Sequence, residues 1–435
     1  MHVNFYKSNI KERKHMNYTK KEIKKGIKLH ILNTDKFKTN LVAIFLTTKL
    51  ERENVTANAL ISAVLRRGTN NMKTQEEISK QLEELYGASF DCGIDKTGDN
   101  QVLKFYIESV NDAFLPQSNE NILKKSIENL LDIILNPLVE NNAFKKEYVE
   151  QEKSNMKQRI AGRIDNKRRY ALDRCIEEMY KGKPFGLYRF GYVEDIDNIN
   201  EVSLYERYKQ LIDQCKIDIF VSGNVNEEVK NIIVENQNVK KLIEREPSYN
   251  TESEKNTVKQ GEKIEKMDVM QGKLVVGLDV NSQNEDEKYN VMIYNTILGG
   301  SANSKIFQNV REKANLAYEA SSRYFRYKDN IFVNCGIEIS NYEKALNLIK
   351  EQLENMKNGD FTEKEVENAK KAIISSIKTI DDEQDTSITY YFGQEMSGNQ
   401  KSVDDYIERI GKVNKKDVIQ VANKVEINTI YFLRN

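Results

Sequence analysis

The feature that most limits how this chain can fold is a set of short motifs that occurs twice in the same order. Each motif of the first half has a counterpart at a matching place in the second half. The four pairs are Ile107-Glu108 before Asn111 with Ile337-Glu338 before Asn341, Phe144-x4-Val149-Glu150-x2-Lys153 with Phe361-x4-Val366-Glu367-x2-Lys370, Ile196-x2-Ile199-x2-Val202 with Ile407-x2-Ile410-x2-Val413, and Ile219-Phe220-Val221 with Ile430-Tyr431-Phe432. One such pair is unremarkable, but four in the same order predict an internal duplication.

The two halves of this 435-residue chain are each long enough to bury a core of their own. Within each half, strand-like runs come first and long helical patterns follow, which favours α+β domains over alternating βα units. Residues 238–267 between them are rich in charge, Asn and Ser, which is typical of a linker. We therefore expect a first domain over residues 1–237 and a second over residues 268–435.

The composition argues against several classes of function. Lys+Arg and Asp+Glu are equal at 67 each, so no overall field favours nucleic acid or an anionic membrane. No apolar run approaches the ~18 residues of a membrane helix, and the four cysteines form no CxxC pair, so we expect a cytoplasmic chain with free thiols. The histidines are His2, His15 and His30 alone, so we expect no histidine-ligated metal, no Ser or Cys triad and no cofactor.

Four segments carry a resemblance to a known family: residues 60–69, 144–160, 170–196 and 299–318. They resemble the insulinase-type zinc peptidases, in the two-domain, processing-peptidase-like branch. The resemblance implies two homologous α+β domains, each an antiparallel-rich sheet packed with long helices. In active members, His-x-x-Glu-His lies on a helix and Gly-Thr follows five residues later. Two histidines at i and i+4 share a helix face and bind one zinc ion, and the Glu between them acts as the general base.

The zinc-binding residues of the family are replaced in this chain. Gly68-Thr69 matches the Gly-Thr pair, which places Ala59 and Ala63 at the histidine positions and Ser62 at the position of the base. Alanine offers no lone pair, and a serine hydroxyl is no carboxylate base at neutral pH. The resemblance therefore implies that the helix remains and its chemistry is lost.

The third zinc ligand of the family is a glutamate in a later helix, seven residues after another glutamate. Matching residues 149–153 to that helix keeps the outer carboxylate as Glu152 and places Arg159 at the ligand position. A shift of one residue would place Gln158 or Ile160 there instead, and neither binds zinc well. An arginine at this position would repel a divalent metal ion.

The second half retains more of the family pattern. Gly299-Gly300-Ser301, residues 304–313 and Leu316-Ala317-Tyr318 resemble the family segment Gly-Gly … Leu-Phe-x-x-Ile-Arg-Glu-Lys-Arg-Gly-Leu-Ala-Tyr. Its Arg and Tyr lie opposite the zinc ion in family members and hold the substrate peptide, and Arg311 and Tyr318 match them. The chain departs from the family at Ala314-Asn315, where Arg-Gly is usual. Conservation of this segment for packing alone is the alternative interpretation.

The resemblance implies a catalytically inactive peptidase homologue. Members of this branch often work as pairs, in which one chain carries the zinc and the other contributes Arg and Tyr to a shared chamber. Residues 83–89 and 176–182 look in particular like a bacterial non-peptidase group associated with aminopentanol modification of elongation factor P. We therefore expect a non-catalytic subunit that pairs with an HxxEH-bearing homologue and binds peptide. The alternative is a stand-alone homodimer that holds peptides or acts as a scaffold.

Overall fold

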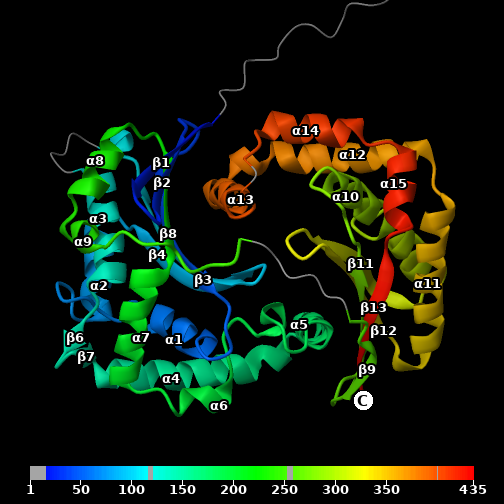
Figure 1. Cartoon of the computed structure of the whole chain (residues 1–435), viewed down its shortest axis with the longest axis horizontal. Helices are drawn as coiled ribbons and strands as arrows, with labels where there is room; N and C mark the ends of the chain where they lie inside the picture. The colour runs from blue at the N-terminus through cyan, green and yellow to red at the C-terminus, as the bar shows by residue number, and fades with distance from the viewer. Residues whose placement is uncertain (1–15, 116–120, 252–257, 399) are drawn as a thin grey trace, which may run out of the picture.

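A computed structural model describes residues 16–115, 121–251, 258–398 and 400–435 of the chain. Most strands of this described part belong to two large sheets, one in each half of the sequence (Figure 1). The first sheet has the order β1-β2-β8-β3-β5-β4 and the second has the order β11-β12-β10-β13-β9. The strands of the first are β1 (Asn17–Lys24), β2 (Ile27–Asn33), β3 (Thr39–Lys49), β4 (Ser89–Thr97), β5 (Asn100–Val110) and β8 (Lys216–Gly223). Those of the second are β9 (Gly261–Lys266), β10 (Gly272–Asp279), β11 (Ala317–Phe325), β12 (Asn330–Ile337) and β13 (Glu426–Arg434).

The two sheets repeat one topology. The order β2-β8-β3-β5-β4 in the first sheet matches β9-β13-β10-β12-β11 in the second. In both, the outer pair (β2 with β8, and β9 with β13) is parallel and the remaining pairs are antiparallel. This confirms the α+β fold with two similar halves and antiparallel-rich sheets. The strand β9 lies within the segment expected to be a linker, and β1 has no counterpart in the second sheet.

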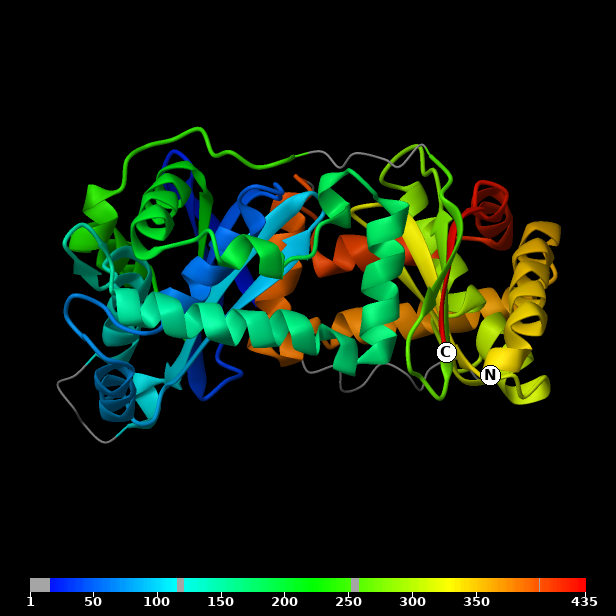
Figure 2. The same ribbon diagram turned by 90° about the horizontal axis from the view of Figure 1, so that it is seen from below.

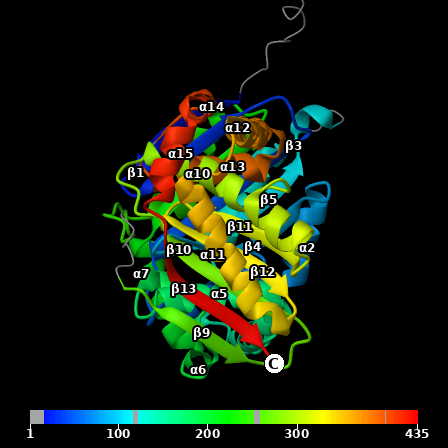
Figure 3. The ribbon, with the colours of Figure 1, turned by 90° about the vertical axis from the view of Figure 1, so that its right-hand side faces the viewer.

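Helices pack on the sheets in both halves. Those of the first half are α1 (Val55–Leu65), α2 (Gln75–Glu84), α3 (Ile122–Leu135), α4 (Lys146–Ala161), α5 (Lys167–Met179), α6 (Val193–Ile196), α7 (Glu201–Gln214), α8 (Glu228–Glu235) and α9 (Gln237–Lys241). Those of the second half are α10 (Glu287–Leu298), the π-helix η4 (Phe307–Lys313), α11 (Tyr342–Asn358), α12 (Glu363–Lys378), α13 (Gln384–Met396), α14 (Val403–Lys412) and α15 (Lys415–Ala422). Figure 3 shows α11 lying across the second sheet on the outside of the molecule.

Local sequence determines where several of these helices begin. At α12, the Thr362 hydroxyl accepts the backbone N–H of Glu365 at 3.2 Å, and the Glu365 carboxylate accepts the backbone N–H of Thr362 at 2.7 Å. This capping box satisfies two N–H groups that have no partner within the helix. Beyond the start of α11, buried Leu346, Ile349 and Leu353 follow one another at helical spacing and face the core of the second half.

The two halves exchange helices across their interface. Helix α5 of the first half packs on the second sheet, where Cys175 and Met179 lie in one apolar cluster with Phe332 and Tyr431. Helix α13 of the second half packs in turn on the first sheet, through a cluster that includes Phe392. Figure 1 shows both helices between the two sheets, and Figure 2 shows the long helix α4 running toward the second half before α5. Each half therefore completes part of the core of the other.

A buried ion cluster accompanies the packing of α13. The Glu395 carboxylate lies 2.9 Å from the ammonium of Lys20, 2.7 Å from that of Lys28 and 3.3 Å from that of Lys216. Burial alone would raise the pKa of Glu395, but the charge of Lys216 and the hydrogen bonds from Lys28 and Lys20 outweigh burial and hold this pKa well below its usual range. Lys20 of β1 and Lys28 of β2 thus hold a helix of the second half against the first sheet. No helix in the described ranges is long and apolar enough to cross a membrane.

Candidate functional site

The four positions at which the family resemblance implies lost zinc chemistry lie together in the structure. Ala59, Ser62 and Ala63 of α1 and Arg159 of α4 line a single pocket of about 280 Å³, which we call the α1 pocket. Residues 92–94 of the edge strand β4 border the same pocket. Helices α1 and α4 pack directly against each other, and this contact brings residues about a hundred positions apart to one place.

The nucleophile-bearing side chains of the α1 pocket are held in unreactive states. The Ser62 hydroxyl donates to the backbone oxygen of Ala59 at 3.2 Å, which engages its proton within the helix. The Cys92 thiol lies 3.6 Å from the backbone oxygen of Ser62, and burial raises the pKa of this thiol to about 11. A thiol with so high a pKa is almost fully protonated at neutral pH. Among the described residues, neither group forms a hydrogen bond with a side chain that could act as its base.

The α1 pocket is rich in arginine side chains. Arg66, Arg67 and Arg159 all line it, against the single lining carboxylate of Glu152. The Arg67 Nε donates to Glu152 Oε1 at 2.5 Å, and the Arg159 guanidinium lies 5.2 Å from the centre of the Phe190 ring. An excess of guanidinium groups repels a divalent cation. Within the described residues, no group of three or more His, Cys, Asp or Glu side chains is placed to hold a metal ion.

The Gly-Thr pair that sets the register has a structural role of its own. A Cβ atom at Gly68 would lie 2.5 Å from the backbone oxygen of Lys73, so a side chain at this position would clash with the turn. The Thr69 hydroxyl accepts the backbone N–H groups of Asn71 at 3.1 Å and Met72 at 2.9 Å. These two residues close the turn after α1 and do not depend on a metal ion.

Arg311 and Tyr318 lie outside the lining of the α1 pocket. The Arg311 guanidinium stacks over the Phe307 ring at 4.6 Å within η4, and Tyr318 is 66% exposed at a bulge near the start of β11. Asn315, which stands where the family has glycine, takes a left-handed conformation with φ of +52°. Asparagine tolerates this conformation better than most residues, so the turn between the two side chains forms without glycine.

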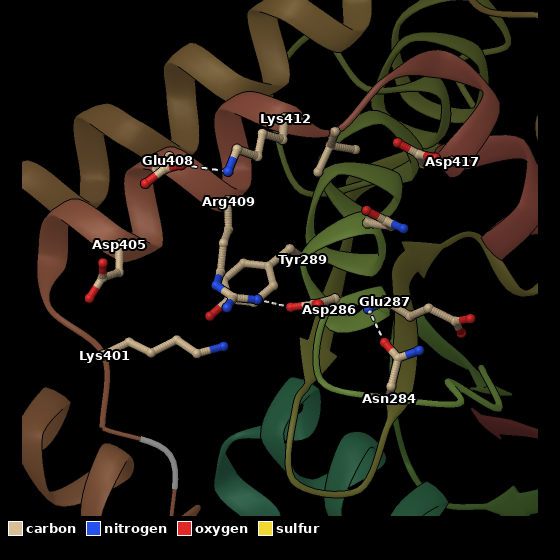
Figure 4. A pocket seen from close by; sticks show the side chains of 12 residues that line it. Asn284, Asp286, Glu287, Tyr289, Lys401, Asp405, Glu408, Arg409, Lys412 and Asp417 are labelled. Carbon is tan, nitrogen blue, oxygen red and sulfur yellow. Dashed lines mark hydrogen bonds and ion pairs between the residues drawn. The ribbon is translucent and has the colours of Figure 1, made fainter.

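Another pocket lies on the second half, between the start of α10 and helix α14 (Figure 4), and we call it the outer pocket. Several of its charged side chains pair with other charges of the chain. Arg409 pairs with Asp286, Lys412 pairs with Glu408, and Glu287 lies 2.8 Å from Lys424. Such exposed, mutually paired charges are common on protein surfaces and indicate no particular ligand.

A further pocket lies where the two halves meet, and the sequence patterns gave no sign of it. Its lining comes from the end of β4, from α5, from residues 185–189 and from the turn that joins β11 to β12. We call it the seam pocket. Its residues come from separate segments of the chain, so no motif spacing could have brought them together.

Comparisons with known proteins agree with this geometry. The family model described as the peptidase M16 inactive domain matches residues 198–373. The probable inactive metalloprotease YmfF of Bacillus subtilis (strain 168) is 34% identical over 412 residues, which are 94% of this chain and 96% of YmfF. The chain belongs to the M16 inactive-domain family. This M16 membership confirms the expectation of a peptidase homologue of the inactive kind.

Two more M16-like matches extend the comparison. The uncharacterized zinc protease YmfH of Bacillus subtilis (strain 168) is 32% identical over 169 residues, 38% of each chain. A solved structure of a conserved protein from Enterococcus faecalis V583 superposes with a TM-score of 0.87 at 27% identity, covering 96% of this chain and 99% of that one. The M16 fold of this chain is therefore shared along nearly its whole described length.

Proposed function

We propose that this chain is the non-catalytic subunit of a peptidase pair, in which an HxxEH-bearing M16 homologue supplies the zinc and this chain helps to enclose and bind the peptide. The observation that carries the proposal is the selective loss in the α1 pocket. Ala59, Ser62, Ala63 and Arg159 meet there, none of these four side chains is a zinc ligand, and the helices and the Gly68 turn around them are formed.

Two further features support peptide binding. Along its described length β4 pairs only with β5, so its other edge, beside the α1 pocket, has no described strand paired with it, which is the kind of edge that a peptide strand can join. Arg311 and Tyr318 present a five-donor guanidinium and a phenol, both suited to peptide carbonyl groups. Tyr318 is largely exposed, and an exposed aromatic side chain contributes more to recognition than to folding.

Support for a partner comes from the relatives. Bacillus subtilis holds both a relative named as a probable inactive metalloprotease and one named as a zinc protease. One cell therefore contains both kinds of chain that the proposed pair requires.

On the earlier family resemblance, we also propose a cytoplasmic location and an association with aminopentanol modification of elongation factor P.

The proposal is tested by adding this chain to an HxxEH-bearing M16 homologue from the same cell. We expect the purified chain to cleave no peptide alone and to raise the rate of the partner when mixed at equal concentration. The double variant Arg311→Ala/Tyr318→Phe should lose most of this increase, with KM rising more than kcat falls. Arg409→Ala/Tyr86→Phe is the matched control, because Arg409 lies in the outer pocket and Tyr86 is 53% exposed.

An unchanged partner rate on addition of this chain would remove the proposal. In that case, light scattering and pull-down from the native cell would address the second candidate, a stand-alone peptide-binding homodimer. A stable homodimer without a peptidase partner is the result that the second candidate requires.

A further inference from the structure

The seam pocket encloses about 360 Å³, which is within the range of small-ligand sites. Both halves contribute to its wall, Lys96 of β4 and Ile176 of α5 from the first half and Phe325 of β11 from the second. It also adjoins the α1 pocket along one strand. Residues 92–94 border the α1 pocket and Asp95 and Lys96 border the seam pocket, so the distance from Cys92 to Lys96 along β4 is about 13 Å.

Lys96 places a positive charge in this pocket without a carboxylate partner. Its ammonium donates to the backbone oxygens of Phe185 at 2.6 Å and Leu187 at 3.0 Å, and lies 4.4 Å from the centre of the Phe185 ring. Among the described residues it forms no ion pair, and an ammonium has three donors, so one remains for a ligand. Burial lowers the pKa of Lys96 to about 8, which leaves it mostly protonated at neutral pH.

Arg189 supplies a second positive group on the same wall. Its Nε is buried and has no hydrogen-bond partner in the described part of the chain. A buried donor without a partner costs free energy that a bound acceptor would recover. Arg323, on the opposite wall, likewise forms no ion pair with any described carboxylate.

The carboxylates around the pocket are already neutralised by other cations. Asp95 lies 2.9 Å from Lys104, Asp173 lies 3.0 Å from Arg169, and Glu177 lies 2.5 Å from Arg163. The remaining basic groups are also paired: Arg326 lies 3.0 Å from Glu285 and Lys328 lies 2.9 Å from Asp99. Within the described ranges, the charge that has no ion-pair partner in this pocket is therefore positive and belongs to Lys96, Arg189 and Arg323.

The rest of the lining is apolar or aromatic. Phe185, Tyr188 and Ile176 contribute from the first half, and Tyr324 and Phe325 contribute from the second. A ligand that matches this pocket has a negative group for the basic side and an apolar body for the aromatic side. A peptide's C-terminal residue with an apolar side chain combines both, because its α-carboxylate and its side chain share one carbon atom.

We propose that the seam pocket binds the C-terminal residue of a peptide, with its α-carboxylate against Lys96 and Arg189 and its side chain against the aromatic wall. This inference rests on the proposed function, since it assumes that the chain holds peptides, and it specifies peptides with a free, apolar C-terminus. An internal Asp or Glu side chain offers the same carboxylate chemistry but no adjoining apolar body, so the test separates the two sources.

The experiment measures the fluorescence anisotropy of three fluorescein-labelled peptide libraries as the full chain is added. Each peptide has nine residues: the first library ends in leucine with a free carboxylate, the second ends in leucine amide, and the third ends in leucine amide with a fixed internal glutamate. We expect the free acid to bind at least about tenfold more tightly than either amide, which corresponds to the loss of one charged hydrogen-bonded contact.

Variants assign the preference to the pocket. Lys96→Met should abolish the difference between free acid and amide, and Arg189→Gln should reduce it, with melting temperatures showing that both variants fold. Lys412→Met in the outer pocket is the control and should leave the difference unchanged. Equal binding of free acid and amide by the unaltered chain would overturn the inference and leave the proposed function standing. Tighter binding of the glutamate library than of the free acid would overturn it as well. Absence of binding by all three libraries would overturn both.

Discussion

The α1 pocket and the seam pocket lie side by side along the edge strand β4, yet they differ in how their charge is used. In the α1 pocket, Glu152 is bonded to Arg67, and alanine and arginine stand at the positions that the family resemblance assigns to the zinc ligands. In the seam pocket, the carboxylates have cation partners, while Lys96 and Arg189 form no ion pair with any carboxylate in the described part of the chain. Under the two proposals, the α1 pocket lacks the residues of a reaction and the seam pocket has the residues of a binding site.

Under the proposed function, the loss of chemistry is local. The α1 helix, the tight turn at Gly68 and the packing of α4 are the same scaffold that an active site of this family would need. Because the scaffold is intact, inactivity does not require a disturbed fold.

The largest expected effect is the recovery of zinc binding in the α1 pocket. The variant Ala59→His/Ser62→Glu/Ala63→His/Arg159→Glu restores two histidines at i and i+4 together with a third ligand on α4. We expect calorimetry to detect zinc binding by this variant and none by the unaltered chain. The same variant with Arg159 retained should bind zinc about 10–100-fold more weakly, since it lacks one ligand and keeps a cation beside the metal. A folded fourfold variant that binds no zinc would show that the alignment of α1 or α4 is wrong.

The second effect concerns the stability of the α1 pocket. Glu152→Ala should lower the free energy of unfolding by about 2 kcal/mol, because the removal of this largely buried carboxylate leaves Arg67 without its partner. Glu150→Ala on the same helix is the control. Glu150 is about half exposed and pairs with Lys153 at 3.0 Å, so its loss should cost less than about 0.5 kcal/mol. Urea denaturation measures both, and equal values would indicate that the Arg67–Glu152 pair adds nothing.

The smallest effect is a pH dependence in the seam pocket. Lys96 binds a carboxylate only when it is protonated. Burial lowers the pKa of Lys96 to about 8. The charges of Asp173 and Glu177 raise this pKa, and those of Arg169 and Arg189 lower it further. A peptide α-carboxylate stays ionised above neutral pH. Affinity for the free-acid library should therefore be greatest below pH 8 and fall about tenfold between pH 7 and pH 9. Anisotropy titrations at several pH values measure this, and Lys96→Met should give a flat profile. A flat profile for the unaltered chain would argue against contact between Lys96 and the carboxylate.

Some of this arrangement followed from the sequence. The repeated motifs predicted two similar halves, and the matching strand order confirms them. Gly68 and Thr69 also aligned the preceding residues with the family motif. The helix that we expected there is present from Val55 to Leu65. These features are local, because a turn that excludes a side chain and a helix with an apolar face leave their marks in neighbouring residues.

Other features depend on tertiary packing and had no local signal. Helical spacing in α5 and α13 shows that each buries one face, but not that each covers the sheet of the other half. Lys96, Arg189 and Phe325 come from three distant segments, so the seam pocket exists only once the helices are exchanged. The sequence around Lys20 and Lys28 likewise gave no indication that Glu395 would lie against them.

The most direct test of the central claim, that this chain is the non-catalytic member of a peptidase pair, is native mass spectrometry of the chain isolated gently from its own cells. We expect a complex of one copy of this chain, one copy of an HxxEH-bearing M16 chain and one zinc ion. The measured zinc should remain with the partner chain when the complex is dissociated in the gas phase. A homodimer of this chain without zinc and without a peptidase would contradict the claim.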